Sequence, residues 1–399
     1  MNRFVNKLIS KSLSSGERCM VCLIGLTLNS TCFIIPIRGH CRHQNAKYFN
    51  RKSFKLEKRW WISSFAVIAC LFISFIKYIL DIKKILSTGD SKLAGLLAVE
   101  ECIFVCAFML VAIIAILRSK ERVSFLNSLE IMLKNKYYKE IIDASWKWAA
   151  VRKWFYLRLF LGLMFVVTDS FLVIFFKEDG SLYKNFSLIL STYTLISLNV
   201  QGCNELAIIV KFRICIDMRL LEHLNMRRNG GNSYNIQLKE HLKRIGRFYV
   251  DFHNCVTNRL NSFLGPIMVV WNLATIIMLV FDIYMKTLIV QDTSEKKNIF
   301  NQLRTLVHLV GIYALVASGE KVTCVSDSTL SFLFKYPISK LSEIEAHQVE
   351  MLIYTLSTHK PEIKASDIFT VGNRLLPSIS GAVVTYVLVA LQFRPAWLN

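Results

Sequence analysis

The chain has 399 residues, of which 53% are hydrophobic, and its mean hydropathy is +0.40. A soluble domain is usually close to half apolar and far less hydropathic, so the composition argues against an ordinary soluble protein. The net charge is +21, from 49 basic and 28 acidic residues. In a soluble chain this excess would suggest nucleic acid. Here the charges gather between the apolar runs, so we expect no nucleic-acid partner.

Seven long apolar runs divide the sequence. About 20 apolar residues cross the hydrocarbon core of a bilayer, and such a segment must be helical because lipid offers no partner to a free backbone group. The predicted fold class is therefore an all-α polytopic membrane protein, with one domain over 1–399. The predicted spans are 61–80, 93–117, 155–176, 183–210, 263–285, 303–319 and 370–393.

A further uncharged run at 19–37 precedes the first span and has three interpretations. It could be an eighth span, a cleaved signal peptide or a helix on the inner side of the membrane. Its Gly25 and Pro36 make a poor span, and its end lacks the small residues of a signal-peptide cleavage site. We expect 1–60 to be a cytosolic N-terminal region whose apolar run abuts the membrane, with an eighth span as the alternative.

Basic residues are concentrated on one side of the predicted bundle. The four segments 1–60, 118–154, 211–262 and 321–369 hold 12, 9, 10 and 5 Lys or Arg residues, whereas the shorter alternate segments hold 3, 2, 4 and 1. Basic loops stay in the cytosol. The N-terminus is therefore predicted to be cytosolic and the C-terminus extracellular, which is opposite to a G-protein-coupled receptor.

Two predicted spans continue beyond the membrane as helix. The fourth run starts near Leu182 and meets no strong breaker before Gly230 and Gly231, which predicts a helix of about 47 residues and about 70 Å. Over 236–262 apolar residues then recur at spacings of three and four, which predicts an amphipathic helix. Its apolar face packs within the chain or against another subunit. The apolar residues are Leu238, Leu242, Ile245, Tyr249, Phe252, Val256 and Leu260.

The histidines of these inner helices, His223, His241 and His253, are expected to be solvated. Further on, Ser342 and Glu345 fit a capping box that starts another amphipathic helix, and His359, Lys360 and Pro361 end it. The last element is therefore predicted in two halves. Segments 211–262 and 321–369 form a predicted cytosolic anchor.

The final span carries a short motif in which Thr385 and Tyr386 are followed by five apolar residues and then Gln392 and Phe393. This chain resembles the insect gustatory receptors, whose last span ends in this pattern, and its stretch GAVVTY resembles the last span of the related insect olfactory co-receptor. The resemblance implies a tastant-gated, nonselective cation channel in the plasma membrane of sensory neurons. It also implies a homotetramer or a heteromer with other gustatory receptors, with the last helix lining the pore.

Helical spacing places Thr385, Val389, Gln392 and Phe393 near one face of the last span. The resemblance implies that Val389, Gln392 and Phe393 form the gate. An apolar ring with adjacent amides can close by dewetting and still admit hydrated cations when it widens. From the spacing alone, helix packing accounts for the same residues, because Thr and Gln also join neighbouring helices.

Several spans carry polar residues in their predicted outer halves, where such residues are costly and often functional. The family is thought to bind tastants in an outer pocket, and a mixture of carboxylates, hydroxyls and aromatic rings suits a small polar ligand. Any of them could instead snorkel or cap a neighbouring helix. The candidates are Glu101, Asp169, Tyr193, Asp282, His308 and Tyr313.

The sequence shows no nucleophile–base pair, phosphate-binding loop or HExxH pattern, so we do not expect an enzyme. Cys19, Cys22, His40, Cys41 and His43 could suggest zinc, but no second CxxC follows, so we expect neither metal nor cofactor. A G-protein-coupled receptor, a transporter and a subunit that conducts only with partners remain as alternatives. The first lacks its motifs, and the second lacks visible repeated halves.

Overall fold

The computed structural model describes residues 37–39, 54–56, 58–88, 92–134, 182–228, 235–289 and 295–392. Two short antiparallel hairpins accompany the helices: β1 (Ile37–Gly39) with β2 (Phe54–Leu56), and β3 (Lys364–Ala365) with β4 (Phe369–Thr370). The helices are α3 (Lys58–Thr88), α4 (Lys92–Leu117), α5 (Ser119–Lys134), α8 (Leu182–Arg228), α9 (Asn235–Asn254), a π-helical turn (Cys255–Leu260), α10 (Asn261–Ile289), α11 (Glu295–Lys335), a 3₁₀ turn (Ile338–Lys340), α12 (Glu343–Thr358) and α13 (Leu375–Gln392).

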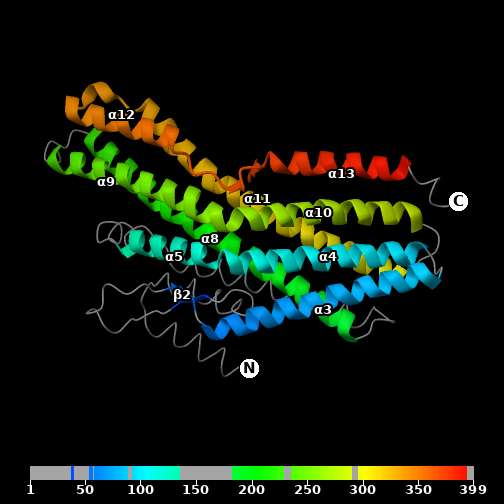
Figure 1. Ribbon diagram of the computed structural model, residues 1–399. Helices are drawn as coiled ribbons and strands as arrows, with labels where there is room; N and C mark the ends of the chain where they lie inside the picture. Colours follow the sequence, from blue (N-terminus) through cyan, green and yellow to red (C-terminus); the bar gives the residue numbers. More distant parts are fainter. Residues whose placement is uncertain are drawn as a thin grey trace.

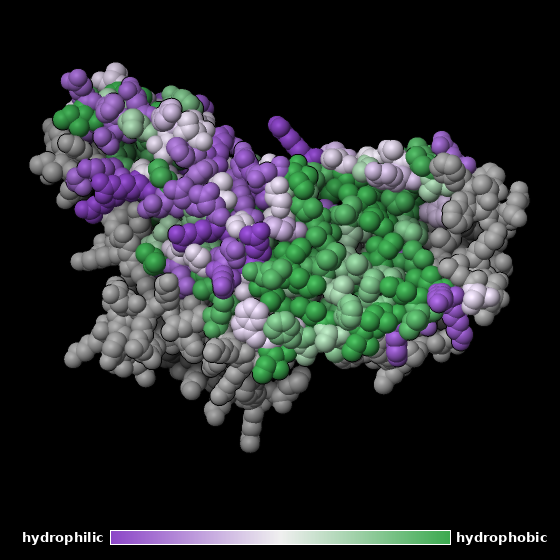
Figure 2. All heavy atoms as spheres, viewed as in Figure 1, coloured by the Kyte–Doolittle hydropathy of each residue, from purple (hydrophilic) through white to green (hydrophobic). Residues whose placement is uncertain are grey.

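The helices form an elongated bundle with two chemically different halves. Helices α3, α4, α10 and α13 lie side by side in one half, α9 and α12 lie in the other, and α8 and α11 run through both (Figure 1). The surface is apolar over the first half and largely polar over the second (Figure 2). We call these the apolar half and the polar half. The division is what a helical bundle standing partly in lipid and partly in water requires.

Five helical segments among the described residues are long and apolar enough to cross a membrane. They are Ser64–Ile85, Ala98–Leu117, Glu240–Tyr284, Leu309–Lys335 and Leu375–Gln392. They coincide with or overlap five of the predicted spans, and the stretch in α11 runs further than the predicted 303–319. The fourth predicted span lies within α8, whereas 155–176 and 19–36 lie outside the described residues.

The long helix predicted from Leu182 is confirmed, because α8 has 47 residues. The apolar stripe of the following helix is also confirmed. Ile245, Tyr249 and Phe252 are at most 1% exposed, while Lys243 and Arg247 on the other side are exposed. The stripe is covered within the chain, since α9 packs on α12 and α8. The intrachain interpretation is therefore correct for this face, and no second subunit is needed to cover it.

The prediction that the inner histidines are solvated is wrong for His241. This side chain is only 7% exposed, and its ring centroid lies 4.0 Å from that of His223 on α8. Burial lowers the pKa of His223, and the positive charge of Arg219 lowers it further. His253 forms an edge-to-face pair with His359 at 5.1 Å. These histidines are flanked by both polar and apolar residues and lie outside the predicted apolar stripe. The spacing of apolar residues therefore could not show that their rings pack.

The last element is divided as predicted, although its second half starts later than expected. Ser342 accepts from the Glu345 N–H and the Glu345 side chain accepts from the Ser342 N–H, which is the predicted capping box, and His359 caps the C-terminus of α12. The expected span 370–393 is wrong at its start. Residues 370–374 form the end of β4 and a turn, and α13 begins at Leu375.

The β3–β4 hairpin between α12 and α13 packs against the transmembrane helix α10. Its turn residues Ser366 and Asp367 have φ of 50° and 59°. A Cβ added at Gly265 of α10 would lie 2.8 Å from the Ser366 nitrogen and 2.9 Å from the Lys364 carbonyl oxygen. The hairpin backbone therefore occupies space that only a glycine on α10 leaves open.

We expect Gly265→Ala to lower the stability of the folded protein by about 1–3 kcal/mol, because backbone atoms must move to admit the methyl group. Gly246→Ala is the matched control, since nothing lies within 4 Å of its added Cβ. Alanine favours an α-helix over glycine by about 1 kcal/mol, so the control should hold or gain stability. Thermal unfolding in detergent, followed by size-exclusion chromatography, measures both. Equal midpoints for the two variants would contradict the close approach.

Candidate functional site

Helix α13 has one face against the bundle and one face outside it. Ile379, Val383 and Val387, spaced four apart, are buried, and α13 packs on α10. By helical periodicity Thr385 and Gln392 lie on the opposite side, and both are exposed. Val389 is 43% exposed. In the part of the chain that the structure describes, the predicted pore face is thus exposed.

The other residues of the terminal motif differ in what the structure shows. Tyr386 is 58% exposed. The Thr385 hydroxyl donates to the Gly381 carbonyl oxygen at 2.9 Å, so its hydrogen is used within the helix. Phe393 lies outside the described residues. Three of the four predicted pore residues therefore share one exposed face, and the role of that face stays a prediction.

The six predicted pocket residues are only partly visible. Asp282 on α10 is 7% exposed, while Tyr313 on α11 is 61% exposed, so these two do not share one buried environment. The backbones of Glu101, Tyr193 and His308 lie in α4, α8 and α11, but their side chains lie outside the described residues, as does all of Asp169. The outer pocket therefore stays a prediction.

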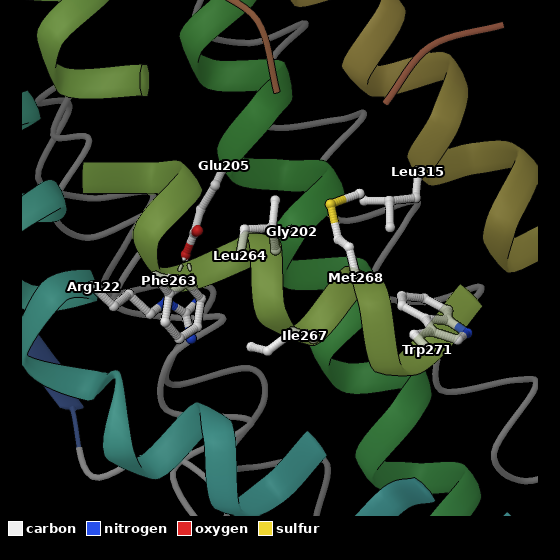
Figure 3. Close-up of a pocket in the computed structure, with 9 residues that line it drawn as sticks. All are labelled: Arg122, Gly202, Glu205, Phe263, Leu264, Ile267, Met268, Trp271 and Leu315. Atoms are coloured by element: carbon white, nitrogen blue, oxygen red, sulfur yellow. Dashed lines mark hydrogen bonds and ion pairs between the residues drawn. The ribbon is translucent and has the colours of Figure 1, made fainter. Parts of the chain in front are cut away.

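A small enclosed cavity lies instead where α5, α8, α10 and α11 meet. At one end Arg122 of α5 reaches Glu205 of α8, and Trp271 of α10 stands at the other (Figure 3). The space open to a water-sized sphere is about 10 Å³, which is room for about one water molecule and too little for an organic ligand. The remaining lining residues are Gly202, Phe263, Leu264, Ile267, Met268 and Leu315.

Arg122 and Glu205 form a buried ion pair. Their side chains are 1% and 5% exposed, the Arg122 Nε atom lies 3.1 Å from Glu205 Oε1, and Nη2 also bonds that oxygen. The guanidinium lies over the Phe263 ring, 5.0 Å from its centroid. Arg122 Nη1 and Glu205 Oε2 are buried without a protein hydrogen-bond partner. A water molecule in the adjoining cavity would satisfy such atoms.

A second buried ion pair lies further along α8. Arg213 Nε donates to Asp217 Oδ1 at 3.0 Å, and its guanidinium stacks 3.7 Å from the Tyr249 ring centroid. Tyr249 donates its hydroxyl to Asp217, and Arg213 Nη2 donates to Ser326 Oγ of α11 at 3.4 Å. Burial raises the pKa of Asp217, while the Arg213 charge opposes that rise. This pair joins α8, α9 and α11.

Sequence reasoning missed both pairs. A signal was present, because Glu205, Arg213 and Asp217 are charged residues within the largely apolar stretch NELAIIVKFRICID of α8, which also holds Asn204 and Lys211. Arg122 lies five residues after the end of the second predicted span, 93–117. Glu205 lies within the predicted fourth span, whereas Arg122, Arg213 and Asp217 fall in segments predicted to be cytosolic. Nothing in their spacing shows that they are buried.

The family of the chain follows from comparison with known proteins. The family model described as 7tm Chemosensory receptor matches residues 23–396. The chain belongs to that family. No curated protein matches the sequence of this chemosensory receptor.

Two solved structures show the same fold as this chemosensory receptor. The insect olfactory receptor OR5 from Machilis hrabei in complex with eugenol is 15% identical, with a TM-score of 0.66 over 93% of this chain and 97% of that one. The OR5 structure described without a ligand is 14% identical, with a TM-score of 0.67 over 92% and 96%. The likeness covers both the apolar and the polar half, and it confirms the predicted all-α fold.

Removing one member of the buried pair should destabilise the receptor strongly. Arg122→Met leaves the Glu205 carboxylate buried without its cation, which costs about 3–5 kcal/mol, whereas the double variant Arg122→Met/Glu205→Met should recover most of that loss. Arg219→Met is the matched control, because the Arg219–Glu222 pair is exposed and such pairs contribute about 0–1 kcal/mol.

Thermal midpoints of the four proteins in detergent provide the measurement. A double variant no more stable than Arg122→Met would show that the loss does not come from an unpaired buried carboxylate at Glu205.

Proposed function

We propose that this receptor is a gustatory receptor, a tastant-gated and nonselective cation channel of four copies in the plasma membrane of sensory neurons. Membership of the chemosensory receptor family supports a receptor function. The terminal motif from Thr385 to Phe393 favours the gustatory branch. The structural relative OR5 was solved in complex with eugenol, which supports a small-molecule ligand for this fold.

The uncovered face of α13 carries the proposal. A Gln392 amide turned toward lipid would lack hydrogen-bond partners, which is costly in a membrane. The same amide facing an axis between copies would contact water and cations. Val389 would then provide an apolar ring beside it, which closes the path by excluding water. The exposed polar and aliphatic side chains on one face suit a gated pore better than a lipid contact.

Gating requires a tastant that binds the open state better than the closed state, because only differential affinity shifts the population. The proposed site is the outer pocket, for which Asp282 is the one buried candidate with a described side chain. Binding there would move α10 and α11, which both contact α13. Widening at Val389 and Gln392 would follow.

The gate is tested with two valines of α13. We expect Val389→Thr to raise the ion flux of unliganded liposomes severalfold, because a hydroxyl at the constriction favours wetting. Val384→Thr is the matched control: Val384 is also exposed, at 58%, but lies on a different side of the helix. Sodium flux through purified receptor in liposomes measures both. An equal response of the two variants would remove Val389 from the gate.

The unmodified receptor in the same liposomes should also conduct when a tastant panel is applied. Silence across a broad panel, with the protein folded and tetrameric, would count against an autonomous channel. Current that appears only after co-reconstitution with a second gustatory receptor would assign the chain a subunit role.

The proposed topology places the N-terminus in the cytosol and the C-terminus outside. An epitope tag before Met1 should bind antibody only after the cells are permeabilised, and a tag after Asn399 should bind on intact cells. The opposite labelling pattern would match a G-protein-coupled receptor and contradict the channel model.

A further inference from the structure

The connection between α12 and α13 is fastened at several points before α13 begins. The Asn261 amide of α10 donates to the Glu362 carbonyl oxygen at 2.9 Å. On α11, a Cβ added at Gly319 would lie 3.0 Å from the Val371 carbonyl oxygen and 2.9 Å from Val371 Cγ1. The chain therefore reaches α13 while it is held against both α10 and α11.

The next residue of α11, Glu320, makes the last of these contacts. Its Oε2 atom accepts from the Asn373 backbone N–H at 2.9 Å, and a Cβ added at Gly372 would lie 2.5 Å from the same oxygen. Asn373 stands two residues before Leu375, where α13 begins. The first N–H groups of a helix have no partner inside it, and negative charge near them is favourable. Glu320 supplies that charge from a different helix.

The second carboxylate oxygen of Glu320 is held as well. Cys324, one turn further along α11, donates its S–H to Oε1 at 3.2 Å. With both oxygens engaged, the carboxylate has a fixed direction on α11. The contact with Asn373 thus joins two helices through one oriented group.

Helix α11 can transmit a movement to Glu320, because it is continuous from Glu295 to Lys335. At about 1.5 Å per residue, Glu320 lies about 18 Å along the helix from His308 and about 10 Å from Tyr313, the two pocket candidates on α11. The exposed residues of α13 lie further along the chain, after the Glu320–Asn373 contact. A shift of α11 at the outer pocket would reach α13 first at its N-terminal end.

We propose that Glu320 is the positioning residue through which α11 controls the inner end of α13. The role in gating rests on the proposed channel function, whereas the contact itself does not. Loss of the carboxylate removes the contact of α11 with Asn373 without touching the exposed pore face. Glu320→Ala removes the acceptor, and Glu320→Gln keeps an oxygen that accepts from Asn373 but loses the charge.

Asp327→Asn is the matched control. Asp327 is another carboxylate on α11, two turns further along, and it pairs with Lys360 at 2.8 Å rather than with α13. A variant there perturbs the contact of α11 with Lys360, which follows the end of α12. It leaves the start of α13 unchanged.

Hydrogen–deuterium exchange of the full receptor in lipid nanodiscs tests the contact. We expect Glu320→Ala to speed exchange at Asn373 about tenfold, with faster exchange across the first turn of α13, since one charge-assisted hydrogen bond is lost. Glu320→Gln should change exchange less, and Asp327→Asn should not change it there. Exchange at Asn373 in Glu320→Ala that matches the unmodified receptor would overturn the proposal.

Sodium flux through the same proteins in liposomes tests the coupling. We expect Glu320→Ala to change the unliganded flux severalfold, while Asp327→Asn leaves it unchanged. If the unmodified receptor conducts and the exchange changes but the flux does not, Glu320 is structural only and the coupling role is wrong. If the unmodified receptor never conducts, the channel function fails and the gating role fails with it. The exchange result would still show whether α11 holds α13.

Discussion

The unbroken helix α8 sets the arrangement of the whole bundle, because it carries charges through a crowded interior. Its backbone needs no outside partner, but Glu205, Arg213 and Asp217 are each at most 6% exposed and must be neutralised where they lie. Arg122 does this from α5, and Tyr249 and Ser326 contribute from α9 and α11. Each pair specifies which helix approaches α8 and at what height.

The helices are held together by different contacts in the two halves of the molecule. In the polar half α8, α9, α11 and α12 are locked by buried charge, stacked rings and a capping box. In the apolar half, α10 and α11 continue beyond this locked region. Helix α13 packs against them through one stripe of three buried aliphatic side chains. Among the residues that the structure describes, the receptor thus combines a firmly packed base with a terminal helix that packs on α10 and α11 by one face.

The spacing of apolar residues and of helix-breaking or capping residues predicted the local features of single helices. The length of α8 followed from the absence of breakers before Gly230, and the buried stripe of α9 followed from spacings of three and four. The start of α12 followed from Ser342 and Glu345. Partner choice could not be predicted in the same way. Arg122 and Glu205 are 83 residues apart, and no sequence pattern shows which apolar face α9 meets.

The hairpin before α13 was missed for a different reason. Strands of two residues are too short for any periodic signal, and the Ser366–Asp367 turn lacks the Asn-Gly or Asp-Gly pair that marks such hairpins. The sequence also could not show whether a polar residue of a span is buried in the protein or exposed on its surface. Asp282 and Tyr313 had the same predicted role, yet one is buried and the other exposed.

The glycines around the start of α13 make some positions of the chain less tolerant of substitution than others. A methyl group added at Gly265 or Gly319 would meet backbone atoms at 2.8–3.0 Å, so these two positions tolerate few replacements, whereas at Gly372 it would meet only the end of the Glu320 side chain, which can move. The outward side chains of α13 contribute little to folding of the single chain, and they can diversify at small cost. Selection for folding therefore acts mainly on the residues that hold the start of α13 and much less on its outward face.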